Sequence, residues 1–158
     1  MQDKSVIFKT IEQYFCWYPV IKKEFMLTLD ERRYDYKTGG TDGKALINDR
    51  TANQAIKEIE PPFVPKIYIM VNNEKGGIYV KRVVNPFKWM QLFEWARKQA
   101  AKNKIQTAVF EGRYVRQELH TATASKNGIS RQAYFDARAE ILHMALAGAC
   151  QLGLIKVM

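Results

Sequence analysis

The residue types with the clearest chemical meaning lie in one run near the end of the chain, from His120 to Ala137. Gly128 can adopt the left-handed conformation that ends a helix, and Ser130 can cap the helix that follows. This spacing predicts a short helix, a tight turn and a second helix, the arrangement that places its second helix in the major groove of DNA. A helical hairpin that never contacts DNA is the alternative, because the same spacing occurs there.

The first turns of the predicted second helix carry side chains suited to base edges. Arg131 can bond guanine through two N–H groups and Gln132 can bond adenine, each worth about 1–3 kcal/mol of discrimination. Asp136 is either an acceptor for cytosine or an ordinary solvated charge. Basic residues before the helix would hold phosphates and set its register without reading sequence. The candidate DNA-binding residues are Arg113, Arg116, Lys126, Ser130, Arg131, Gln132, Phe135, Asp136 and Arg138.

Basic residues are concentrated around this run. The 158 residues include 25 Lys and Arg and 16 Asp and Glu, which gives a formal net charge of +9. Residues 97–138 hold nine basic and three acidic side chains, whereas residues 1–96 hold 15 and 12. A concentrated basic stretch is what phosphate binding requires, so nucleic acid is the favoured polyanion. Attraction to a membrane surface, or simple solubility, would also account for the charge.

The elements that must position this run begin near the N-terminus. Apolar residues spaced by three and four predict an aromatic core helix over residues 5–26, with a kink or break near Pro19. The character of the chain changes over residues 30–51, where the glycine-rich segment 36–43 predicts an exposed loop. A short capped helix is expected over residues 48–59, before a pair of prolines.

The middle of the chain carries the only convincing strand pattern. Residues 66–71 and 78–84 are rich in β-branched and aromatic types, and turn residues separate them over 72–77. This pattern predicts a β-hairpin. Its basic side chains are either a wing that touches the DNA backbone or solvated edge charges, and they are Lys75, Lys81 and Arg82.

Two further helices complete the predicted elements. Asn85 as a cap and Pro86 at the first helical position predict a helix that runs to about Lys102. The helix that starts after Ser130 continues in a small and apolar pattern to about Leu152. The side chains expected at the helix crossing and in the core of this region are Ala124, Ile129, Tyr134, Ala137 and Ile141.

These elements predict a mainly α fold, a helical protein with a C-terminal helix-turn-helix and one inserted β-hairpin. The expected divisions are an N-terminal helical segment and linker over 1–60, the hairpin over 61–84, and the helix-turn-helix DNA-binding region over 85–158. One domain, or two small lobes that share a core, suits a chain of this length.

Several classes of protein are excluded by the sequence. No stretch approaches the roughly 18 apolar residues of a membrane span, and residues 1–10 lack the apolar block of a secretory signal. Cys16 and Cys150 are expected to be buried, reduced thiols of a cytoplasmic protein. Zinc-ligand spacings and Ser/His/Asp or Cys/His arrangements are missing, so we expect no cofactor, no metal and no enzymatic activity. We expect His143 to be a packing residue.

The C-terminal half resembles a known family. The residues that carry the resemblance are Gly128-Ile129-Ser130-Arg131 and Tyr134-Phe135, behind an aromatic N-terminal helix and a Gly/Asp/Thr linker over 39–51. The chain is similar to the phage late-gene transcriptional regulators of the ArpU/RinA type, whose C-terminal half is similar to the promoter-reading region 4 of sigma factors. The likeness is firmest over residues 113–155. It implies that the residues in contact with bases are Arg131, Gln132, Phe135 and Asp136.

The expected function is therefore sequence-specific binding of double-stranded DNA by a transcriptional regulator that activates phage late genes. Its expected partners are double-stranded DNA, host RNA polymerase and a second copy of the chain in a homodimer, without a membrane, in the host cytoplasm. A DNA-packaging protein similar to a small terminase subunit is the alternative. A metal-dependent nuclease is disfavoured, because its available carboxylates lie in the expected loop region and are Asp30, Glu31, Asp35, Asp42 and Asp49.

Overall fold

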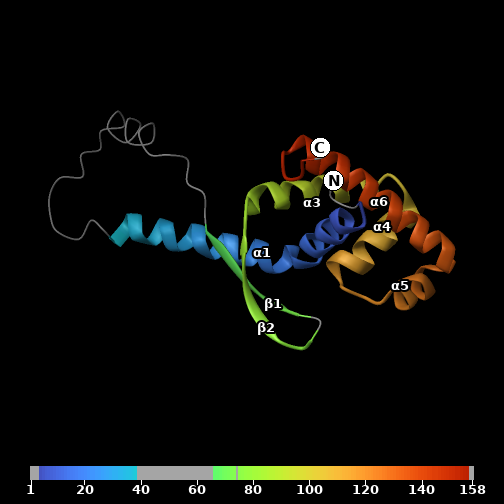
Figure 1. Ribbon diagram of the computed structural model, residues 1–158, viewed down its shortest axis with the longest axis horizontal. Helices are drawn as coiled ribbons and strands as arrows, with labels where there is room; N and C mark the ends of the chain where they lie inside the picture. Colours follow the sequence, from blue (N-terminus) through green and yellow to red (C-terminus); the bar gives the residue numbers. More distant parts are fainter. Residues whose placement is uncertain (1–3, 39–65, 74, 157–158) are drawn as a thin grey trace. The chain divides into compact units, whose positions relative to one another are not determined.

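The computed structural model describes residues 4–38, 66–73 and 75–156. The described chain is mainly helical with one antiparallel hairpin, as the sequence predicts (Figure 1). Of the glycine-rich loop expected over residues 36–43, residues 36–38 belong to a helix, and the rest lies outside the described residues, as does the short helix expected over 48–59. The elements are α1 (Lys4–Thr38), β1 (Ile67–Asn72), β2 (Ile78–Val83), α3 (Pro86–Ala100), α4 (Lys104–Phe110), the π-helical turn η1 (Glu111–Val115), α5 (His120–Asn127) and α6 (Arg131–Gln151).

The chain divides into two compact units that do not follow the expected boundary at residue 60. The first unit comprises Met1–Lys22 and Asn85–Met158, and the second comprises Lys23–Val84. The beginning of α1 therefore belongs with the C-terminal helices, about 60 residues away in the sequence.

Helix α1 is continuous through Pro19, so of the two alternatives expected there the break is wrong, while the kink stays a prediction. An interior proline removes one main-chain hydrogen bond and costs about 3 kcal/mol. Three residues around it, Phe15, Tyr18 and Ile21, are buried on one face, and their packing offsets that cost. The helix also continues through residues 30–38, where the sequence predicts a change of structure. Charged residues such as Glu, Arg and Lys are good helix formers, so their presence does not mark a helix end.

Aromatic rings join α1 to the C-terminal helices of the first unit. Phe15 packs edge-on against Phe93 of α3 and Tyr114 of η1, with centroid distances of 5.3 and 5.4 Å. The ring of Tyr18 stacks on Phe93 at 3.7 Å, and Phe110 of α4 lies 5.0 Å from Phe93. Each such pair contributes about 0.5–1.5 kcal/mol beyond its buried area. Figure 1 accordingly shows the first part of α1 beside α3 and α4, so this helix completes their core.

The start of α3 differs from its prediction. Pro86 lies in the first turn as expected, but Asn85 has a left-handed backbone (φ 54°, ψ 54°) and its side chain makes no cap hydrogen bond. A side-chain cap requires an extended backbone, which brings the side-chain oxygen over the open amides, so the expected Asn85 cap is wrong. The helix ends at Ala100, close to the expected end.

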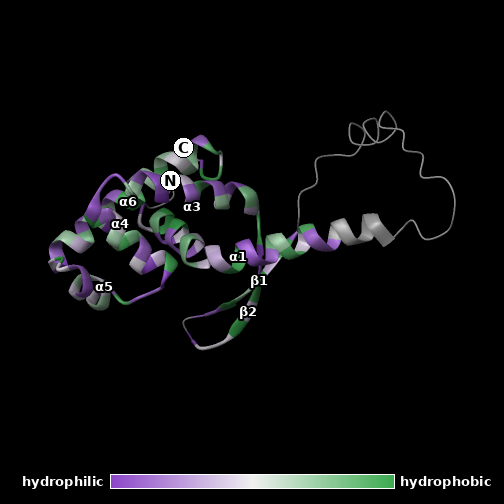
Figure 2. Ribbon diagram, turned by 180° about the vertical axis from the view of Figure 1, so that it is seen from behind, coloured by the Kyte–Doolittle hydropathy of each residue, from purple (hydrophilic) through white to green (hydrophobic). Residues whose placement is uncertain are grey.

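Helices α3 and α6 approach each other closely at a glycine. A Cβ at Gly148 would lie 2.8 Å from Leu92 Cδ1 and 2.9 Å from Trp95 Cζ3. Along α3 hydrophobic and hydrophilic residues alternate in bands, which is the pattern of a helix that buries one face (Figure 2). Neither cysteine is paired: Cys16 is half-buried, and Cys150 is exposed, which corrects the prediction that it is buried.

The hairpin of the second unit is confirmed. Its antiparallel register pairs Ile67 with Val83 and Met70 with Val80. The turn is closed by the Asn73 side chain, whose Oδ1 accepts from the Gly77 amide at 2.6 Å. Alternate residues of β1 are buried and exposed, which is the period of a strand with one covered face.

Candidate nucleic-acid interface

The turn between α5 and α6 has the two helix-end features that the sequence predicts. Gly128 has a φ of 63° and ends α5, and the amide of Ile129 donates to the oxygen of Ala124 at 2.9 Å. The hydroxyl of Ser130 accepts from the amide of Ala133 at 3.1 Å and caps α6. The predicted helix ends and the Ser130 cap are thus confirmed. Their effect is to fix the first turn of α6 relative to α5.

Helix α5 packs closely against η1, and the residues at this contact differ from those expected. Thr123 of α5 is fully buried, and a Cβ on Gly112 of η1 would lie 2.4 Å from its hydroxyl oxygen. Ala124, expected at the crossing, is only half-buried. Ile129 is half-buried too and lines a hollow of about 330 Å³ between α4 and the turn, so it does not fill the core as predicted. The inward-facing residues predicted for α6 are all buried: Tyr134, Ala137 and Ile141.

Arg131 and Gln132 lie exposed in the first turn of α6. Within the described part of the chain, the guanidinium of Arg131 forms no ion pair, and it lies 5.8 Å from the centroid of the Phe135 ring. The side-chain amide of Gln132 donates to Asp136 Oδ1 at 2.8 Å. Arg131 is therefore available to a ligand, whereas Gln132 and Asp136 each use part of their hydrogen-bonding capacity on the other.

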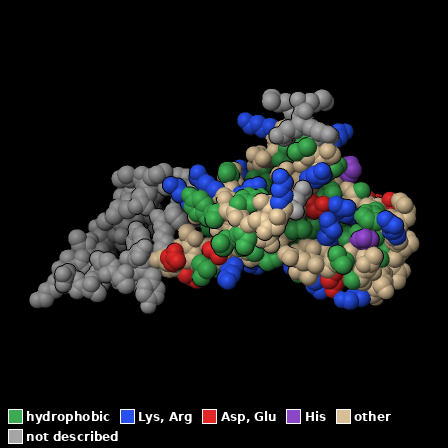
Figure 3. All heavy atoms as spheres, turned by 60° about the horizontal axis from the view of Figure 1, so that its bottom comes forward, with side chains coloured by type: hydrophobic (Ala, Val, Ile, Leu, Met, Phe, Trp, Pro, Cys, Tyr) green, Lys and Arg blue, Asp and Glu red, His purple; other side chains and the backbone are tan. Residues whose placement is uncertain are grey.

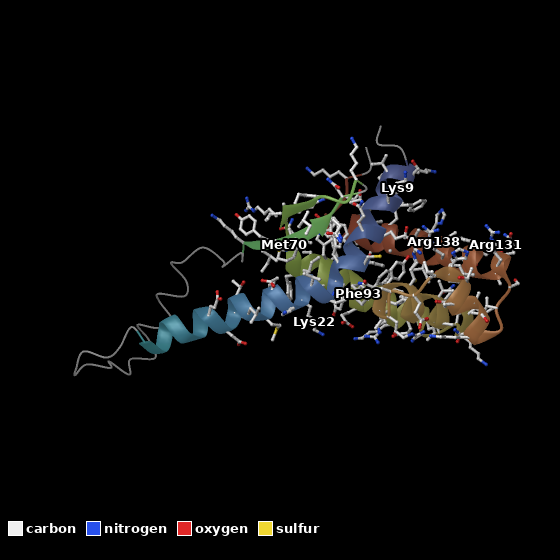
Figure 4. The ribbon with its side chains drawn as sticks, turned by 90° about the horizontal axis from the view of Figure 1, so that it is seen from below. Lys9, Lys22, Met70, Phe93, Arg131 and Arg138 are labelled. Atoms are coloured by element: carbon white, nitrogen blue, oxygen red, sulfur yellow. The ribbon has the colours of Figure 1, made fainter. Side chains whose placement is uncertain are left out.

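Phe135 lies at the centre of a stripe along α6. Its ring is half-buried and lies 5.4 Å from the rings of both His120 and Tyr134. The guanidinium groups of Arg131 and Arg138 lie 5.8 and 6.0 Å from the Phe135 centroid, within cation–π range. Figure 4 shows Arg131 and Arg138 projecting from the same side of α6. We call Arg131, Phe135 and Arg138 the α6 stripe.

Arg138 is also held by a carboxylate of α1, together with Arg113. Glu12 Oε1 accepts from Arg113 Nε and Arg138 Nε, both at 2.7 Å, and Glu12 Oε2 accepts from Arg138 Nη2 at 2.6 Å. Burial alone would raise the pKa of Glu12, but the hydrogen bonds from Arg138 and Arg113 outweigh it and lower that pKa. Both side chains thus fasten α1 to η1 and α6, and their contact with DNA stays a prediction.

Arg116 and Lys126 form a second, separate cluster. Both approach Glu118 Oε1, at 3.2 Å from Arg116 Nε and 2.6 Å from Lys126 Nζ. The hydrogen bond from Lys126 is the main cause of the lowered pKa of Glu118. The Lys126 side chain is 63% exposed, so it can exchange this partner for a phosphate at small cost.

The nine predicted residues therefore lie in two groups. One lies along α6 and is joined through Glu12 by Arg113 of η1, and the other surrounds Glu118. Sequence reasoning missed Glu12 and did not assign His120 a neighbour. Glu12 is an isolated acid beside an apolar stripe, and no local pattern marks such a residue as the partner of arginines far along the chain. Figure 3 shows Lys and Arg side chains interspersed with acidic and hydrophobic ones on the face it presents. The candidate site is therefore distinguished from the rest of this surface by the arrangement of its side chains, and not by a uniform positive charge.

Among the described residues, no three His, Cys, Asp or Glu side chains come together as metal ligands. None of the helices described is both long and apolar enough to cross a membrane. Comparisons of the chain with profiles of known protein families, with curated proteins and with solved structures find no match.

Proposed function

We propose that this protein is a transcriptional regulator that binds double-stranded DNA and reads its sequence with the first turn of α6. The observation that carries the proposal is the position of Arg131. It follows the Ser130 cap directly, it is exposed, and it has no ion-pair partner among the described residues. An arginine at the start of a helix behind a tight turn can bond O6 and N7 of guanine in the major groove.

The packing around α5 and α6 supports the same role. Helix α4 lies against both of them, so the first turn of α6 is held by two other helices. A base-reading side chain needs such a rigid support, because a loss of position weakens its paired hydrogen bonds. Arg116 and Lys126 lie on or beside α5, where exposed cations would contact backbone phosphates without reading sequence.

The resemblance to phage late-gene regulators supports the biological part of the proposal. The regulator would act in the host cytoplasm, recruit host RNA polymerase and activate late genes. A homodimer would bind two half-sites about one helical turn apart, which multiplies the affinity of a single reading helix.

Selection of bound duplexes from a random DNA pool tests this function directly. The selection is carried out at two salt concentrations with the wild-type chain and with Arg131→Ala. We expect one motif that survives the higher salt, and the loss of a guanine preference in the variant. Binding without enrichment, lost steeply with salt, would contradict sequence reading and would favour a DNA-packaging protein.

A further inference from the structure

The cluster around Glu12 contains more positive than negative charge. Arg113 and Arg138 share one carboxylate, and the hydroxyl of Tyr114 donates to the same Glu12 Oε1 at 3.2 Å. The four hydrogen bonds that Glu12 accepts match the capacity of a carboxylate, which accepts about four. Because Glu12 carries a single negative charge, it can neutralise only one of the two guanidinium groups.

Both guanidinium groups keep donors that the described protein does not use. A guanidinium has five N–H groups. Arg113 donates to protein through Nε, and Arg138 donates through Nε and Nη2, in the described part of the chain. The two side chains are each 28% exposed. Part of each side chain is therefore open to solvent, from which an anion could approach the remaining N–H groups.

These donors are also held in place before any ligand arrives. Glu12 fixes both arginines from α1, and the Phe135 ring lies beneath Arg138. An arginine that is already ordered loses little side-chain entropy when it binds, and its planar fork matches two oxygens of a phosphate. The exposed Lys126, by contrast, is held only through its single ammonium group.

We propose that Arg113 and Arg138, ordered by Glu12, form a binding site for one phosphate of the DNA backbone. Arg138 lies two helical turns beyond Arg131 on the same side of α6, roughly 10 Å along its axis. A strand whose base edge meets Arg131 would place a neighbouring phosphate near Arg138. This inference rests on the proposed function for the identity of the ligand, while the oxyanion site itself is a separate property of the cluster.

NMR signals of the arginine Nε–H groups test the site in the wild-type chain. Inorganic phosphate is added first, and then a short duplex. We expect the Arg113 and Arg138 signals to shift with both ligands. Arg97 is the internal control, because it is held by Glu111 in a comparable pair (2.6 and 3.0 Å) and lies outside the cluster. Its signal should stay unchanged.

The remaining outcomes each overturn part of the inference. Unshifted Arg113 and Arg138 signals, or an equal shift at Arg97, would exclude a phosphate site. Shifts with inorganic phosphate but not with duplex would exclude the DNA backbone as its ligand. Shifts with a duplex of any sequence, combined with a failed selection experiment, would leave the phosphate site in place and reject the sequence-reading function.

Two matched variants give an independent measurement. Arg113→Gln should weaken duplex binding several-fold and lower the slope of log affinity against log salt by about one, whereas Arg97→Gln should leave the slope unchanged. If the cluster served only to fasten α1, Arg113→Gln would lower the stability of the fold but would leave this slope unchanged.

Discussion

The side-chain amide of Gln117 donates a hydrogen bond to the main-chain oxygen of Cys16, with an Nε2–O distance of 2.8 Å. Cys16 precedes Pro19 by three residues, in the turn of α1 where proline disturbs the main-chain hydrogen bonds. Gln117 itself has a left-handed backbone, with a φ of 55°. A strained residue after η1 thus supplies a donor to the part of α1 that the proline weakens.

Two substitutions of Gln117 distinguish the contribution of its hydrogen bond to stability from the cost of its left-handed backbone. Gln117→Ala should lower the free energy of unfolding by about 1 kcal/mol, because the donor is lost while the left-handed residue keeps its Cβ. Gln117→Gly also loses the donor but avoids the steric cost of that conformation, so it should be about 1 kcal/mol more stable than Gln117→Ala. Urea unfolding measures both. Equal stability of the two variants would contradict a strained backbone at this position.

Acid should weaken the attachment of α1. The Glu12 pKa is lower in the folded state than its ordinary value of about 4.3, so ionised Glu12 stabilises the fold above that pH. This stabilisation should disappear as the pH falls through the lowered pKa. Glu12→Gln should cost about 1.5–3 kcal/mol at pH 6, and progressively less as the pH falls below the ordinary pKa of a glutamate. Thermal unfolding across this range tests it, and a difference that is constant with pH would count against the ion pair.

A methyl group at position 112 should disrupt the packing of α5. In Gly112→Ala the new Cβ would lie 2.4 Å from Thr123 Oγ1 and 2.6 Å from Thr123 Cγ2, both far too close. We expect a loss of about 1–3 kcal/mol in unfolding free energy. The double variant Gly112→Ala/Thr123→Ala removes the clashing atoms and should recover part of that loss. If the two changes had additive effects on the free energy of unfolding, the side chain of Thr123 would not be what restricts position 112.

Two buried tyrosines should respond oppositely to the loss of a hydroxyl. Tyr134 Oη is buried and has no hydrogen-bond partner among the residues that the structure describes, whereas Tyr114 Oη donates to Glu12. Tyr134→Phe should therefore be neutral or stabilising by about 1 kcal/mol, and Tyr114→Phe destabilising by a similar amount. Chemical unfolding compares the pair. A marked destabilisation by Tyr134→Phe would reveal a partner for its hydroxyl.

Two cations near the turn should affect DNA binding in different ways. Arg131→Ala should relax the preference for one base, at a cost of about 1–3 kcal/mol on the selected site. Lys126→Ala should weaken binding to all sequences alike and lower the salt slope by about one. Fluorescence anisotropy with specific and scrambled duplexes separates these effects. A sequence-selective loss in Lys126→Ala would place α6 in a different register on DNA.

The sequence predicts the features that depend on neighbouring residues. Gly128, Ser130 and the two strands of the hairpin each act through main-chain conformation within a few residues, and each is found as predicted. The sequence pattern ends α1 too early, because charged residues continue a helix as readily as they end one. Asparagine permits a left-handed backbone as well as an extended one. Asn85 takes the left-handed conformation, in which its side chain does not cap the helix.

The candidate site could be predicted only in its local part. Arg131 and Gln132 are exposed in the first turn of α6, as the spacing after Ser130 indicates. The role of Glu12 could not be predicted, since its contact with Arg138 joins residues that are 126 positions apart. A single sequence contains no signal for such a pair. The hydrogen bond between Gln117 and Cys16 could not be predicted for the same reason.

The grouping of residues up to Lys22 with those from Asn85 onward has a consequence for synthesis of the chain. Helix α1 is synthesised before α3 and α6. Its apolar face therefore stays uncovered for some seconds, until Phe93 and Arg138 have been synthesised. The first unit therefore completes its fold late, and during this delay α1 is the segment that a chaperone would hold. A fragment that ends before residue 85 would lack α3 and α6, so the apolar face of its α1 would stay uncovered.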